Sequence, residues 1–180
     1  MKTKKLILSF AIILSLSACS AVYSTHPVGD SPLILKSADW EGTWISAEGT
    51  LVTRIADTAG ILEAAWIDKI DTGLKYESVR AHLMTWQDWV FINIENEDDQ
   101  GNTRYVWGRV KKKGRLVLLW APDLEKIKAL VNAGDLPGRV DNGDVILDPL
   151  SPSQMKRLTA PDKELLFDWE EPLVLIRMGD

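Results

Sequence analysis

The sequence predicts a mainly β protein: an antiparallel meander of about eight strands that forms a small barrel or a strongly curved sheet, with one or two short helices before the last strand. Two observations predict it. From residue 42 onward, short segments of alternating apolar and polar residues follow one another, separated by turn residues such as Gly, Asn and Asp. A helical period replaces the alternation only at residues 123–133 and, more briefly, at residues 151–159.

The alternation also indicates which face of each strand is buried. The predicted strands are, in order, 42–47, 51–56, 60–67, 75–83, 89–95, 104–110, 115–120, 144–147 and 173–178. In the third of them, Leu62, Ala64 and Trp66 share one face, which we predict to point inward. The strand 89–95 has the highest β propensity in the chain, so we place it centrally.

A helix is predicted at residues 123–133 because Leu124, Ile127 and Leu130 fall on one helical stripe. Pro122 precedes it and Gly134 follows it, which is the arrangement typical of helix ends. The second, shorter helix opens at Ser151.

The N-terminus has the three regions of a signal peptide, predicted at residues 1–18: a start with three lysines, an apolar run and a processing site. That site, Leu16-Ser17-Ala18-Cys19, resembles the bacterial lipobox. The resemblance implies that Cys19, the only cysteine, receives a diacylglyceryl group and becomes the first residue of a membrane-anchored mature chain. The other interpretation is an ordinary signal peptide that happens to contain a buried cysteine. In the sorting rule that this region resembles, Ser20 favours the periplasmic face of the outer membrane.

The mature chain divides into a tether and a domain. Residues 19–37 contain Pro27, Gly29 and Pro32 among Ser, Thr and His and show no sustained periodicity, so we predict a flexible tether. Residues 33–35, Leu-Ile-Leu, are the part that would dock on the domain if the tether is ordered. Residues 38–180 are then one β-rich domain, a normal size for a single core.

Charge excludes two classes of partner. The formal net charge is −5, and it becomes −8 when the three lysines of the signal peptide are removed. Binding of nucleic acid, or of anionic lipid headgroups through a polybasic patch, needs clustered Lys and Arg. We therefore predict no nucleic-acid partner, and a membrane partner only through the lipid on Cys19.

Gly42-Thr43-Trp44 opens the first predicted strand and resembles the Gly-x-Trp motif of the lipocalin and calycin barrels, which hold apolar ligands. The resemblance implies that Trp44 packs across one end of a barrel beneath an arginine of the last strand. Arg177 lies in the last predicted strand. The two helices before that strand depart from the simple eight-strand order of those families.

Tryptophan supplies the candidate binding residues. The eight tryptophans are Trp40, Trp44, Trp66, Trp86, Trp89, Trp107, Trp120 and Trp169. Three of them, Trp66, Trp89 and Trp107, lie in strands predicted to curve around a common interior, where their rings would contact a ligand. The competing interpretation is that the tryptophans are ordinary core residues.

The motifs of catalysis are missing from the sequence. Its histidines are His26 in the tether and His82 on a strand, and it contains no Gly-x-Ser-x-Gly, no His-Glu-x-x-His and no pair of cysteines. The acidic loop 96–101 starts like a calcium loop, but Trp107 stands at the twelfth position, where a carboxylate is needed. We predict no metal, no cofactor and, more often than not for such a sequence, no enzyme.

The sequence thus leads to a cell-envelope lipoprotein that binds an apolar or amphipathic small molecule, or an envelope polymer, without catalysis. The alternative is a scaffold or assembly factor that binds another envelope protein. A closed barrel with a lined cavity favours the first hypothesis, and an open edge strand with an apolar patch favours the second.

Overall fold

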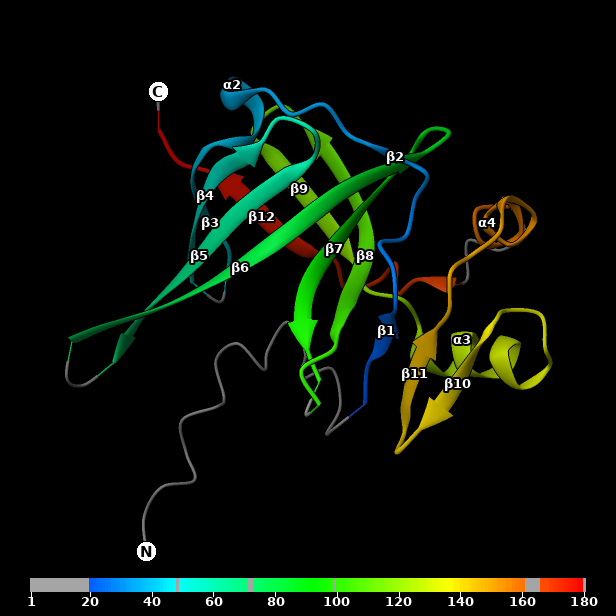
Figure 1. The fold of residues 1–180 in the computed structure, drawn as a ribbon. Helices are drawn as coiled ribbons and strands as arrows, with labels where there is room; N and C mark the ends of the chain where they lie inside the picture. The colour runs from blue at the N-terminus through cyan, green and yellow to red at the C-terminus, as the bar shows by residue number, and fades with distance from the viewer. Residues whose placement is uncertain (1–19, 48, 71–72, 99, 161–165, 180) are drawn as a thin grey trace, which may run out of the picture.

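Eight strands of the described chain close into an antiparallel β-barrel, which confirms the predicted fold class (Figure 1). The computed structural model describes residues 20–47, 49–70, 73–98, 100–160 and 166–179. The barrel strands are β3 (Gly42–Ile45), β4 (Thr50–Asp57), β5 (Ile61–Ile70), β6 (Gly73–Trp86), β7 (Trp89–Glu97), β8 (Thr103–Lys113), β9 (Leu116–Trp120) and β12 (Leu173–Arg177). Consecutive strands from β3 to β9 are neighbours, and β12 closes the ring between β9 and β3. Strand β7 lies between β6 and β8, but a closed ring has no central strand, so the predicted central position does not distinguish β7.

The barrel wall is not uniform. The seam between β12 and β3 is short, with Ile176 opposite Ile45 and Arg177 opposite Trp44. On the other side, β6 and β7 pair only from Trp86 and Trp89 to Ala81 and Ile94. Beyond that point the β5–β6 hairpin diverges from β7 and β8, as Figure 1 shows. The edge of β6 that faces β7 therefore has no partner strand from residue 73 to 80 within the described chain, although β5 pairs with the opposite edge.

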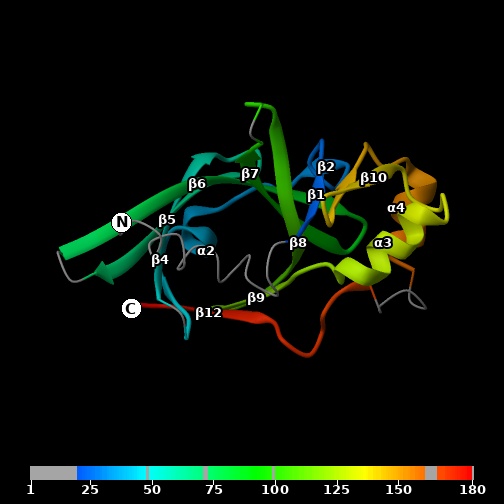
Figure 2. The ribbon, with the colours of Figure 1, turned by 90° about the horizontal axis from the view of Figure 1, so that it is seen from below.

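An outer layer covers one side of the barrel (Figure 2). It consists of β1 (Val22–Ser24), β10 (Gly138–Asp141), β11 (Asp144–Leu147), α3 (Leu124–Asn132) and α4 (Pro152–Leu158). Strand β1 pairs with both β8 and β11, so the barrel sheet continues into this layer.

Both helices start where the sequence predicts, because a side chain caps each of them. The carboxylate of Asp123 accepts the backbone N–H of Lys126 at 3.1 Å. Ser151 and Gln154 form a reciprocal capping box at the start of α4. These caps satisfy amide donors that the first helical turn leaves without a partner.

The predicted flexible tether is wrong, because the chain packs on the barrel from Val22 onward. Strand β2 (Ser31–Pro32) pairs with β6, and the short helix α2 (Ser37–Trp40) follows. Val28 and Leu35 are both buried, and the Leu35 N–H donates to the carbonyl of Thr58. The buried apolar residues of this segment follow no regular period, and they pack in different places: Val28 in the cluster with Phe91 and Trp107, and Leu35 against Leu62 and Leu83. The domain therefore starts near residue 22 instead of residue 38.

Two apolar regions result, one on each face of the barrel wall. In β7, Ile92 and Ile94 face the barrel interior, whereas Phe91 and Asn93 face the outer layer. We call the apolar cluster between the wall and that layer the outer core. Its buried residues are Val22, Val28, Phe91, Trp107, Trp120, Ile127, Leu136, Val145, Leu147, Met155, Leu158, Leu166 and Phe167.

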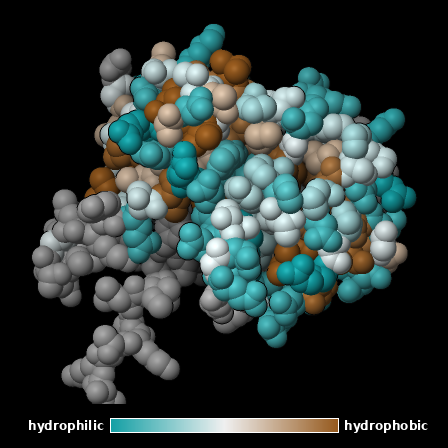
Figure 3. Space-filling model, viewed as in Figure 1, coloured by the Kyte–Doolittle hydropathy of each residue, from teal (hydrophilic) through white to brown (hydrophobic). Residues whose placement is uncertain are grey.

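The outside of the molecule is mostly polar in the view of Figure 3, with apolar residues in smaller patches. None of the helices within the described ranges has the length and apolar character needed to cross a membrane.

Candidate ligand-binding cavity

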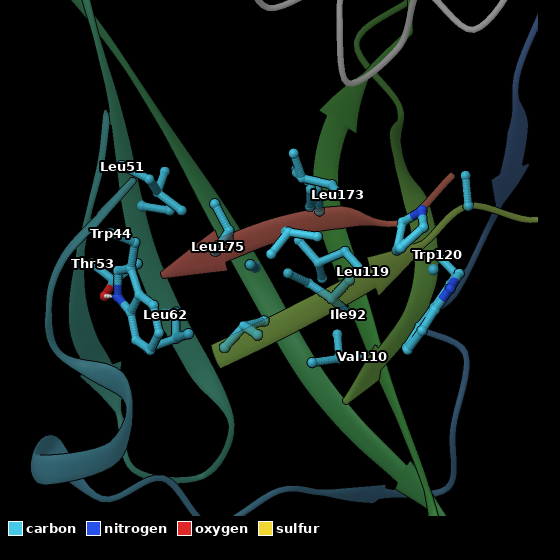
Figure 4. Close-up of a pocket in the computed structure, with 18 of the residues that line it drawn as sticks. Trp44, Leu51, Thr53, Leu62, Ile92, Val110, Leu119, Trp120, Leu173 and Leu175 are labelled. Atoms are coloured by element: carbon cyan, nitrogen blue, oxygen red, sulfur yellow. Dashed lines mark hydrogen bonds between the residues drawn. The ribbon is translucent and has the colours of Figure 1, made fainter. Parts of the chain in front are cut away.

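The barrel interior contains a cavity of about 440 Å³ (Figure 4). Aliphatic side chains from seven of the eight barrel strands form most of its wall, and β3 contributes Trp44. These aliphatic residues include Leu51, Leu62, Ala64, Val79, Ala81, Ile92, Ile94, Val106, Val110, Val117, Leu119, Leu173 and Leu175. Because side chains alternate along a strand, the lining residues of β4 to β7 are spaced two apart. The volume lies within the range of about 300–1,000 Å³ that is typical of ligand pockets.

Trp44 closes one end of the cavity. Its indole is 2% exposed, and its Nε1–H donates to Thr53 Oγ1 at 2.9 Å. The Thr53 hydroxyl in turn donates to the carbonyl of Trp40, in α2, at 2.5 Å. The Lys112 ammonium also holds α2 at this end through Asp39, with Nζ and Oδ1 3.0 Å apart. The Trp44 indole N–H and the Thr53 hydroxyl are thus both already hydrogen-bonded.

The predicted barrel-end pair, Trp44 and Arg177, is adjacent across the β3–β12 seam. The Arg177 guanidinium donates to the carbonyl of Ala38 in α2. A Cβ at Gly42 would lie 3.1 Å from Arg177 Nε, and Gly42 has a φ of +135°. Glycine therefore gives room to the arginine, while the tryptophan two residues later fills the barrel end.

The stacking of Arg177 on the indole, which the family resemblance implies, does not occur among the described contacts. Two other arginines lie over rings: the guanidinium carbons of Arg109 and Arg104 are each 3.7 Å from the ring centroids of Trp89 and Tyr23, respectively.

The other end of the cavity reaches the solvent. Four lining residues are exposed, Ala47, Ala121, Glu171 and Val174, and they lie away from Trp44 where β3 ends, β9 ends and β12 begins. We call these four residues the mouth. In Figure 4, Leu173 and Trp120 lie toward this end and Trp44 and Thr53 toward the closed end.

The three tryptophans predicted to line the interior separate into two groups. Trp66 lines the cavity and is buried, on the face that the sequence predicts to point inward. Trp107 borders the cavity, but its ring packs edge-on against Phe91 and Phe167 in the outer core, with centroids 6.2 and 5.9 Å away.

Trp89 is partly buried, packs against the outer core and is not part of the cavity lining. Its ring stacks on Phe91 with a centroid distance of 6.0 Å, and the Arg109 guanidinium lies over the same ring. The prediction that Trp89 curves around the same interior as Trp66 is wrong, whereas Trp107 does border that interior. Both faces of β7 and β8 are apolar, and alternation alone does not tell which of two apolar faces encloses the cavity.

The lining residues that were not singled out from the sequence include Trp40, Thr53 and Glu171. The sequence pattern could have indicated Thr53, since it lies on the same strand face as Leu51 and Ile55. No such pattern indicates Trp40 and Glu171, because they lie outside the predicted strands and only the tertiary fold brings them to the barrel ends.

The polar groups that drew attention in the sequence lie outside the cavity. His82 Nε2 and Glu95 Oε1 are 2.6 Å apart on the outer face of β6 and β7. Asp98 accepts the N–H groups of Gln100 and Asn102 in the β7–β8 turn, and the Asn102 hydrogen bonds hold the pKa of Asp98 below its ordinary value. The acidic loop is therefore a capped hairpin turn. The described residues contain no group of three or more His, Cys, Asp or Glu side chains placed to hold a metal ion. Cys19, the predicted lipidation site, lies outside the described residues.

Fold and cavity together define a class: a small closed β-barrel with a hollow, apolar interior and one open end. No family model, no curated protein and no solved structure matches this chain.

Proposed function

We propose that this protein is a cell-envelope lipoprotein whose barrel binds an apolar or amphipathic small molecule without catalysis. The observation that supports this most directly is the cavity, because it is enclosed by apolar side chains and reaches the solvent at the mouth. An apolar hollow offers water few hydrogen-bonding partners, so a hydrophobic guest is the better occupant.

The energetic cost of the hollow supports the same function. Side chains that line a hollow lose the packing contacts that a filled core would give them. A ligand that fills the space recovers part of this cost, and it stabilises the native state by mass action.

The chemistry of the lining supports binding over catalysis. Apart from indole groups, its polar side chains are the Thr53 hydroxyl and the Glu171 carboxylate. The hydroxyl is already hydrogen-bonded at the closed end, and the carboxylate is at the mouth. A nucleophile with an adjacent base needs two reactive groups within hydrogen-bonding distance.

The proposed anchor would hold the barrel close to the bilayer. If the mature chain starts at Cys19, two residues separate the lipid from Val22 in β1. The Ala21 N–H already donates to Asp144 Oδ1 at 2.9 Å, so this short segment is fixed to the outer layer. Mass spectrometry of the N-terminal peptide tests lipidation, and a mature chain that begins elsewhere contradicts it. Fractionation tests the proposed outer-membrane location.

A relationship to the lipocalin and calycin barrels is part of the proposal. The eight-strand barrel, the glycine and tryptophan of the 42–44 motif and the pairing of Trp44 with Arg177 support it. The outer layer with β1, β10, β11, α3 and α4 is an addition to the simple barrel.

The test of binding uses the chain from Ser20 onward, which contains every described element. We expect the neutral fluorophore N-phenyl-1-naphthylamine to gain fluorescence in the cavity and to raise the melting temperature. Ala64→Phe places a ring inside the barrel and should abolish both effects. Ala65→Phe, on the outer face of the same strand, should preserve them. Equal fluorophore binding by both variants would contradict a site inside the barrel.

The alternative function, a scaffold for another envelope protein, has one observation in its favour. Ile45 of β3, Ile176 of β12 and Met178 directly after β12 are exposed, and Ile45 is directly opposite Ile176. A stoichiometric protein recovered from envelope extract by the native chain, and lost with Ile176→Lys, would support this alternative. Binding of the fluorophore by Ile176→Lys at native affinity would show that the two surfaces are independent.

A further inference from the structure

Among the described residues that line the cavity, one side chain carries a charge: Glu171. The rest of the lining contains no Lys, Arg or His. The polar side chain at the closed end, Thr53, already accepts the indole N–H of Trp44 and donates to the carbonyl of Trp40. A carboxylate or phosphate that entered the cavity would therefore lose its water and find no cation to replace it.

The polar head of an amphipathic ligand must consequently remain at the mouth, where water is available. Glu171 is exposed there, directly before Pro172, which also lines the cavity. No ion pair joins Glu171 to a cation among the described side chains. Its neighbour Glu170 is also exposed but is not part of the lining. The first charge that a head group meets is thus negative.

We propose that Glu171 determines the ligand class of this barrel, and that the site selects amphiphiles with a neutral or cationic head group over those with an anionic one. This inference rests on the proposed binding function and goes further, because it names a residue and a charge preference. The inference depends on two separate interactions of the ligand, one with its alkyl chain and one with its head group. The apolar wall accepts an alkyl chain of any of these compounds, whereas the mouth distinguishes their heads by Coulomb energy.

The magnitude is that of a charge pair near solvent. Two like charges about 4 Å apart in water change an equilibrium constant by about fivefold, and a lower effective dielectric constant increases the effect. Physiological salt weakens such a pair only in part, because the Debye length of about 8 Å is about twice this distance.

The experiment compares three ligands with the same ten-carbon chain: decanol, decylamine and decanoic acid. At about pH 8 the amine is protonated and the acid is ionised. Each displaces N-phenyl-1-naphthylamine from the chain that starts at Ser20. We expect decanol and decylamine to displace the fluorophore at concentrations at least about fivefold lower than decanoate.

Variants at the mouth identify the residue. Glu171→Gln should reduce the disadvantage of decanoate by about fivefold, and Glu171→Lys should make decanoate a better ligand than decylamine. Glu170→Gln is the matched control and should leave the order unchanged. Equal displacement by decanol and decanoate in the native chain would overturn the inference, as would an unchanged order in Glu171→Lys. If the fluorophore and all three compounds fail to bind, the proposed function fails, and the inference fails with it.

Discussion

The barrel interior and the outer core lie on opposite faces of the same strands, and both are apolar, yet one is hollow and the other is filled. In the outer core, Phe91, Phe167, Trp89 and Trp169 pack ring against ring, with centroid distances from 5.5 to 6.3 Å among these pairs. In the interior, aliphatic and small residues such as Ala64 and Ala81 leave about 440 Å³ open. The difference indicates that the outer core provides stability and that the interior provides space for a ligand.

The largest expected effect is the loss of a ring from the outer core. Phe167 is 2% exposed and contacts the rings of Trp89, Trp107 and Trp169. Phe167→Ala should lower the free energy of unfolding by about 3–5 kcal/mol, because the cavity cannot collapse among rigid neighbours. Urea denaturation measures the change. A loss below about 1 kcal/mol would show that the outer core is not the stabilising region.

A matched pair of leucines compares the two regions directly. Leu147→Ala in the outer core removes a side chain that is 0% exposed, and it should cost about 2–5 kcal/mol. Leu119 borders the hollow and is only half-buried, so Leu119→Ala loses fewer contacts and should cost less. Equal costs, measured by the same denaturation, would mean that the interior is packed as tightly as the outer core.

A matched pair of valines applies the opposite change. Val145→Phe overfills the outer core and should cost about 1–3 kcal/mol. Val110 points into the hollow in Figure 4, so Val110→Phe should change stability by less than about 1 kcal/mol while it weakens fluorophore binding. Thermal unfolding and fluorescence titration provide the two measurements. Strong destabilisation by Val110→Phe would contradict an interior with spare volume.

The smallest effect concerns the closed end of the barrel. A hydrogen bond from Lys112 and its positive charge hold the pKa of Asp39 below its ordinary value. A lowered pKa in the folded state means that the interaction stabilises above the unfolded carboxyl pKa of about 4, and that this contribution is lost as the pH falls below it.

Asp39→Asn should therefore lower the melting temperature slightly near neutral pH, and the difference from the native chain should shrink below about pH 4. Asp141→Asn, at an exposed position of β10, serves as the control. A difference that persists unchanged at low pH would show that the ion pair is not its cause.

Much of the fold could be predicted from local sequence. The alternation in residues 60–67 identified the face of Trp66 correctly, and the residues around 123 and 151 marked two helix starts. Gly42 and Trp44 indicated a barrel end because each has a steric reason to be there: the glycine admits Arg177, and the tryptophan fills the end. The alternation and the helix caps depend on neighbours within a few residues, so the order of residues determines them, whereas the contact of Gly42 with Arg177 needs the closure of β12 on β3.

Only the tertiary structure decided which apolar face is hollow and where residues 22–37 lie. Alternation fixes that Phe91 and Trp89 share one face and Ile92 and Ile94 the other, but strand curvature selects the face that closes around the cavity. Val28 and Leu35 pack against strands that are distant in the sequence, so no local pattern predicts that these two side chains are buried. Glu171 lies at the mouth for the same reason, because its position depends on the pairing of β12 with β9 and β3.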